Sequence, residues 1–181
     1  QQRKMTVEDL YELPDDSHRY ELIGGLLVSE PAPGARHGRV EATIAGLLFQ
    51  YTREQPHVVV LAGDSGFVLH RAPDTVRAPD IAVVRRDRYE ALEDETKTIP
   101  GPPDLEIEVV SPSNRPTEIR GKVADYLSAG SPLVWIVDPE SETVTIYRNL
   151  FEPTVVDSSG TLTDEDLLPG LRLRVAELFE Y

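Results

Sequence analysis

Acidic residues alternate with apolar ones in the segment 103–113, PDLEIEVVSPS. If this segment forms a strand, its apolar side chains lie on one face and its acids on the other. The acids are Asp104, Glu106 and Glu108. Asp and Glu are depleted in strands and like charges at this spacing repel, so something should compensate them. A hard divalent cation such as Mg²⁺ or Mn²⁺ takes oxygen ligands, and we therefore expect it to bind here.

Two other segments supply acids that a sheet would gather beside these. Glu21 lies in the strand-like run RYELI, and Asp80 opens the strand-like run PDIAVV. His37 and Lys122 lie on two predicted helices that would cover the sheet. In phosphodiester hydrolysis, carboxylates hold metal ions that polarise the phosphate and activate a water, while a lysine stabilises developing charge. The set therefore indicates metal-dependent cleavage of a phosphodiester.

The elements that must position these residues alternate between strands and helices. Gly24 and Gly25 predict a tight hairpin between the first two strands, because glycine accepts positive φ angles. The segment between 69 and 79 is expected to be a loop. The expected strands are 19–23, 26–30, 57–62, 66–69, 79–84, the central acidic segment, 133–137, 143–147 and 153–156, with a short strand pairing in the tail. The expected helices are about 6–13, 36–54, a short one within 85–97, one from near Pro116 to Gly130, and a closing one from Val175.

Helical periodicity predicts where the two helix-borne residues point. At about 100° per residue, His37 shares an apolar stripe with Val40 and Ile44, so it faces inward in the first turn of its helix. Lys122 lies at the margin of the stripe that contains Val123, where its stem is buried and its ammonium reaches a neighbouring strand.

Length and composition fit one domain, residues 1–181, of a globular protein with 40% hydrophobic residues. The net charge of −14 argues against a surface that attracts nucleic acid everywhere. Two local basic clusters could still form a rim, and they are Arg85, Arg86 and Arg88, and Arg115, Arg120 and Lys122. The absence of cysteine excludes disulfides and thiolate metal sites. Without an apolar run of membrane length, the expected location is cytoplasmic.

Six segments occur in an order that resembles a known family. They are YELIGG, RHG, APDIAVV, DLEIEVVSPS, GKVADYLSAG and VWIVDP. The sequence is similar, over nearly its whole length, to the Uma family of bacterial restriction endonucleases, within the PD-(D/E)XK nuclease superfamily. The resemblance implies an α/β (α+β) restriction-endonuclease-like fold, with a mixed, bent central sheet flanked by helices. It also implies an endonuclease that uses Mg²⁺ or Mn²⁺, acts on DNA and works as a homodimer.

The same resemblance assigns roles to individual residues. Asp80 and Glu108 would be metal ligands, with Glu106 a possible second ligand on the same strand. Glu21 would be a further acidic member of the site, and His37 a nearby polar group. The superfamily's usual lysine falls on Val110 here. Lys122 matches a lysine that this family carries on the following helix.

Each residue also has a purely structural interpretation. Glu106 could be an edge residue, Glu21 could pair with an arginine such as Arg19, and His37 could be a hydrogen-bonded core histidine. Trp135 and Tyr126 are expected in the core. Two other functions stay open. One is a catalytically silent binding or scaffold module, and the other is a metal-dependent hydrolase of a small phosphoester.

Overall fold

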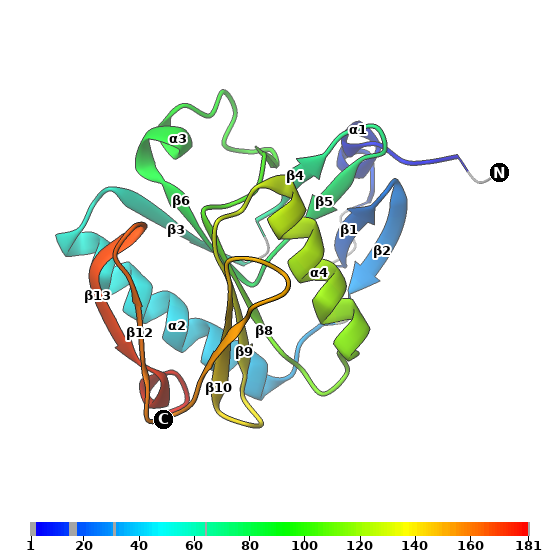
Figure 1. Ribbon diagram of the computed structural model, residues 1–181. Coiled ribbons are helices and arrows are strands. Elements are labelled where there is room, and N and C mark those ends of the chain that lie inside the picture. The colour runs from blue at the N-terminus through cyan, green and yellow to red at the C-terminus, as the bar shows by residue number, and fades with distance from the viewer. Residues whose placement is uncertain (1–2, 15–17, 31, 64, 181) are drawn as a thin grey trace.

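Two larger β-sheets, a small hairpin and the surrounding helices make up the computed structural model, which describes residues 3–14, 18–30, 32–63 and 65–180 (Figure 1). The predicted class, mixed sheets flanked by helices, is confirmed. Apart from this hairpin, the strands are divided between two sheets, whereas the sequence had suggested one central sheet. Among the described residues, no helix is long and apolar enough to cross a membrane.

The six-stranded sheet contains the acidic strand that the sequence singled out. Its strand order is β11-β10-β9-β8-β6-β3. β8 runs parallel to β9 and antiparallel to β6, so this sheet is mixed. The strands are β3 (Val58–Ala62), β6 (Ile81–Arg85), β8 (Leu105–Val109), β9 (Val134–Asp138), β10 (Thr143–Tyr147) and β11 (Thr154–Val156).

The five-stranded sheet has the order β2-β1-β5-β4-β7. The predicted hairpin between β1 and β2 is confirmed, and Gly24 and Gly25 have φ angles of 57° and 81°. β5 was expected to be loop, because three residues are too short to show an alternating pattern. The strands are β1 (Arg19–Ile23), β2 (Leu26–Glu30), β4 (Phe67–His70), β5 (Thr75–Arg77) and β7 (Ile99–Pro100).

The helices begin and end where local chemistry predicts. Thr6 forms a capping box with Asp9 at the start of the first helix. Pro116 occupies the first turn of the fourth helix, and Gly130, with a φ of 103°, ends it. The helices are α1 (Val7–Tyr11), α2 (Ala35–Glu54), α3 (Arg86–Glu90) and α4 (Pro116–Ala129). The tail forms β12 (Thr161–Asp164), β13 (Leu168–Arg174) and a 3₁₀ helix (Val175–Leu178), where a closing helix was expected.

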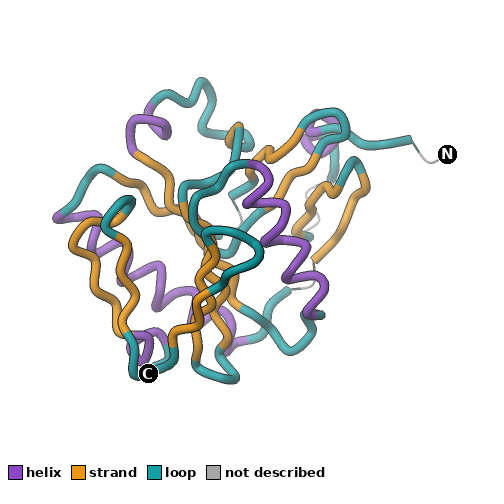
Figure 2. The backbone as a smooth tube through the Cα atoms, in the orientation of Figure 1, coloured by secondary structure: helices purple, strands orange, loops and turns teal. Residues whose placement is uncertain are grey.

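Helices cover both faces of the six-stranded sheet, so β8 is buried on both sides. The face with Leu105 and Ile107 packs in one apolar cluster with Ile44 of α2. The opposite face packs in a second cluster with Val123 and Tyr126 of α4. Figure 2 shows the strands in orange between these two helices in purple. The acids of β8 therefore lie beneath α4, out of bulk water.

Candidate active site

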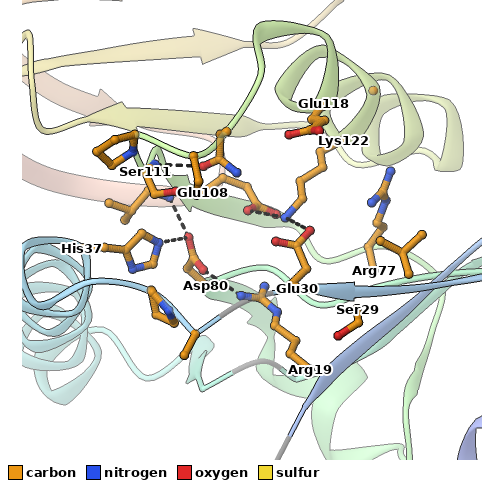
Figure 3. Close-up of a pocket in the computed structure, with 18 of the residues that line it drawn as sticks. Arg19, Ser29, Glu30, His37, Arg77, Asp80, Glu108, Ser111, Glu118 and Lys122 are labelled. Atoms are coloured by element: carbon orange, nitrogen blue, oxygen red, sulfur yellow. Dashed lines mark hydrogen bonds and ion pairs between the residues drawn. The ribbon is translucent and has the colours of Figure 1, made fainter.

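A cavity of about 730 Å³ lies where the β1-β2 hairpin, the start of α2, the loop after β8 and α4 come together (Figure 3). Charged side chains from several separate segments of the chain line it. They include Arg19, Glu30, His37, Asp80, Glu108 and Lys122. Four of the sequence-predicted site residues, from four segments of the chain, thus meet at one place.

Asp80 enters the cavity because it immediately precedes β6. The register pairs Ile81 with Ile107, so the next position outward brings Asp80 alongside Glu108. Asp80 Oδ2 accepts a hydrogen bond from the Val109 backbone N–H at 2.7 Å. Burial opposes the charge of this carboxylate. Hydrogen bonds from His37 and Val109, and the nearby Arg19 charge, nevertheless hold the pKa of Asp80 below its usual value.

Glu108 is held by two side chains from one face of α4. Lys122 Nζ donates to Glu108 Oε2 at 3.0 Å, and the Tyr126 hydroxyl donates to Oε1 at 3.2 Å. Burial raises the pKa of Glu108 to about 7, with Lys122 opposing that rise and Asp80 adding to it. Because Asp80 and Glu108 repel one another here, a cation between them would be stabilised by both.

Lys122 lies between two acids, as Figure 3 shows. Its Nζ is 3.0 Å from Glu108 Oε2 and 3.4 Å from Glu30 Oε1. Burial lowers the pKa of Lys122, but the charges of Glu108, Glu21 and Glu30 more than offset this and leave that pKa raised. The ammonium therefore stays protonated.

His37 faces Asp80 from the first turn of α2. Its Nε2 is 3.1 Å from Asp80 Oδ2, and its Nδ1 is 3.8 Å from Glu41 Oε2. The hydrogen bond with Asp80 raises the pKa of His37, although burial opposes it. One donor atom each from His37, Glu41 and Asp80 lies within 4.8 Å of the others, which suits a cation. The sequence analysis missed Glu41, although its place four residues after an inward-facing histidine was a usable signal.

Glu21 is buried but does not line the cavity. Its Oε2 accepts from Arg77 at 2.7 Å, and its Oε1 accepts from the Ala78 backbone N–H at 2.9 Å. The expected arginine partner is therefore Arg77 and not Arg19, which instead bonds Asp80 Oδ1 at 3.2 Å. Glu21 thus fixes the segment that leads into Asp80.

Glu106 points to a different part of the interior. Its Oε2 accepts from the Ser131 hydroxyl at 2.6 Å, and its Oε1 has no hydrogen-bond partner among the described residues. Burial raises the pKa of Glu106 well above its usual value. Because this carboxyl does not line the cavity, the geometry does not support the predicted role as a second metal ligand.

The first predicted basic cluster does not rim the cavity. Arg85 ends β6 and Arg86 opens α3, so this cluster lies about 16 Å from Asp80, the length of a five-residue strand. Arg85 pairs with Asp104, and Arg88 donates to the backbone carbonyls of Pro100 and Pro102. Of the second cluster, Lys122 is buried inside the cavity wall.

A solved structure shares this fold. A crystal structure described as a putative nuclease belonging to DUF820, from Anabaena variabilis ATCC 29413, shares 23% sequence identity with this chain. The match covers 97% of each chain with a TM-score of 0.82, which shows a common fold. A comparison with the curated proteins gives no match.

The family follows from the sequence match. Residues 7–176 match the Uma2 family, whose description is "Putative restriction endonuclease". The chain belongs to this family, and the predicted resemblance is confirmed. The family match and the shared fold together support the function of a nuclease.

Proposed function

We propose that this protein is an Mg²⁺- or Mn²⁺-dependent endonuclease that hydrolyses DNA phosphodiester bonds. The observation that carries the proposal is the meeting of Asp80 and Glu108, from neighbouring strands, in one cavity with the Lys122 ammonium 3.0 Å from Glu108. This is the residue inventory that phosphodiester hydrolysis needs.

The donor set fits a hard divalent ion. Asp80 and Glu108 offer carboxylate oxygens, and His37 and Glu41 lie next to Asp80 with further donors. When bound, such an ion supplies a Lewis acid that polarises the phosphate and lowers the pKa of a bound water. Burial is the main cause of the raised pKa of Glu108, and an ion at this place would relieve the repulsion from Asp80 that adds to it.

The remaining residues act on charge and orientation. Lys122 keeps its proton, so it serves as a fixed positive charge for the phosphate oxygens and not as a general base. His37 and the Val109 backbone N–H hold the Asp80 carboxylate in place. Arg19 adds a second cation at the wall of the cavity, bonded to Asp80 Oδ1 at 3.2 Å.

One observation favours a second candidate, the hydrolysis of a small phosphoester. The cavity volume, about 730 Å³, lies within the range of small-molecule sites. Restriction-type cutting of duplex DNA usually uses two active sites, so the endonuclease proposal includes a homodimer, which light scattering on the purified protein tests.

The decisive experiment measures cleavage of supercoiled, linear and single-stranded DNA with Mg²⁺, Mn²⁺ or EDTA. We expect cleavage with at least one ion, none in EDTA, and a loss on the order of 10³-fold in Asp80→Ala, since a lost ligand removes several kcal/mol of charge stabilisation. Asp104→Asn is the matched control, because Asp104 bonds the Arg85 backbone N–H beyond the cavity.

Two results would overturn the proposal. One is intact DNA under every condition together with hydrolysis of bis(4-nitrophenyl) phosphate, which would favour the small-phosphoester hydrolase. The other is equal cleavage by the wild type and Asp80→Ala, which would place the activity elsewhere.

A further inference from the structure

Tyr126 is a buried tyrosine whose hydroxyl reaches the proposed metal site from behind. Tyr126 is 0% exposed, and it lies in the apolar cluster that α4 forms with β6 and β9, the two neighbours of β8. The hydroxyl donates to Glu108 Oε1 at 3.2 Å. A buried tyrosine hydroxyl needs a partner, and phenylalanine would fill the same apolar space without that need. The hydroxyl therefore does more than fill space, because its hydrogen bond constrains the Glu108 carboxylate.

The two oxygens of Glu108 have different partners. Lys122 bonds Oε2, while Tyr126 bonds Oε1, and these two residues lie four apart on one face of α4. Lys122 provides charge, whereas Tyr126 provides a neutral donor. With both oxygens bonded, the carboxyl plane is fixed.

We propose that Tyr126 is a positioning residue that orients the Glu108 carboxylate for the divalent ion. This inference rests on the proposed function, in which Glu108 is a ligand of the divalent ion. Tyr126 does not line the cavity, so it touches neither substrate nor ion. Hydrogen-bond partners of ligating groups typically contribute about 10- to 100-fold in metal affinity or activity.

The test compares Tyr126→Phe with the wild type in Mn²⁺ binding without DNA, followed by electron paramagnetic resonance. We expect the Mn²⁺ dissociation constant to rise about 10- to 100-fold. In cleavage assays, the half-saturating Mn²⁺ concentration rises in parallel, while KM for DNA is unchanged. Thermal unfolding without metal reports any general loss of stability.

The chain offers a matched control in Tyr89→Phe. Tyr89 also donates to a glutamate, Glu95 Oε2 at 3.1 Å, but it lies on α3 at the other end of β6. This variant loses the same chemical group and should bind Mn²⁺ as the wild type does. If Tyr126→Phe lowers stability too far, 4-aminophenylalanine at position 126 restores a donor, and it should restore Mn²⁺ affinity to within about threefold.

Three outcomes would overturn the inference. Equal Mn²⁺ affinity in Tyr126→Phe and the wild type would leave the nuclease proposal intact and remove the positioning role. Weak binding with both Phe and 4-aminophenylalanine would assign the effect to packing. If the wild type binds no Mn²⁺, both proposals are overturned. If Tyr126→Phe weakens Mn²⁺ binding but the wild type cuts no DNA, only the nuclease proposal is overturned.

Discussion

Glu106 and Glu108 lie two residues apart on the same face of β8, and their exposed fractions are 0% and 3%. Their surroundings differ because α4 crosses the strand above Glu108. There Lys122 and Tyr126 reach the carboxylate and the cavity begins. The Glu106 carboxylate accepts from the Ser131 hydroxyl, just beyond the end of the helix.

The pKa values of the two acids reflect this difference. Burial raises both, but the Lys122 charge limits the pKa of Glu108 to about 7. Glu106 has no cation opposing its burial. A bound cation would therefore add to the effect of Lys122 on Glu108, whereas the pKa of Glu106 is raised mainly by burial. On β8, the candidate ligand is the acid beside which α4 places a cation.

The largest expected effect contrasts the two acids directly. Glu108→Gln should lower DNA cleavage on the order of 10³-fold, because the amide cannot supply the charge that a divalent ion requires. Glu106→Gln should stay within about threefold of the wild type, since the amide keeps the contact with Ser131. Rates under single-turnover conditions measure both. A comparable loss in the two variants would show that Glu106 belongs to the active site.

The next effect comes from removing the Lys122 ammonium, the cation that Glu108 has beside it and Glu106 lacks. Lys122→Met should cut the rate at pH 7 by about 100-fold, the scale of one lost electrostatic contact in an active site. Without the ammonium, the pKa of Glu108 rises above its present value of about 7. The acidic limb of the pH–rate profile should therefore move to higher pH. Lys97→Met, at an exposed lysine paired with Asp94, is the control, and an unshifted limb in Lys122→Met would contradict this account.

The smallest effect concerns stability without metal. The folded-state pKa of Glu106 is raised above its ordinary value of 4.5, so the protein loses stability as pH rises from 4.5 towards that raised pKa. Glu106→Gln cannot ionise and avoids this loss. The difference in Tm, variant minus wild type, should grow with pH above 4.5 to about 2–4 °C, or roughly 1 kcal/mol in a domain of this size. A difference that is flat between pH 4 and 8 in EDTA would contradict the assigned burial.

Much of the fold was predictable because it depends on local pattern. The Gly24–Gly25 hairpin, the Gly130 helix end and the inward position of His37 followed from glycine conformation and helical periodicity. β5 escaped prediction because its three residues are a strand only through pairing with β1 and β4. The division into two sheets likewise depends on long-range pairing that no local pattern encodes.

The sequence by itself supplied four residues of the site, His37, Asp80, Glu108 and Lys122. Alternation on β8 and the acid that opens β6 marked Asp80 and Glu108, and the helix margin marked Lys122. Only the tertiary structure decided which acids share a cavity. In the folded protein, Asp80 is hydrogen-bonded to His37 and Glu21 accepts from Arg77. Glu106 lies outside the cavity and accepts from Ser131. The physical reason is that periodicity assigns a side chain to a face, while the packing of helices on that face decides its neighbours and its charge.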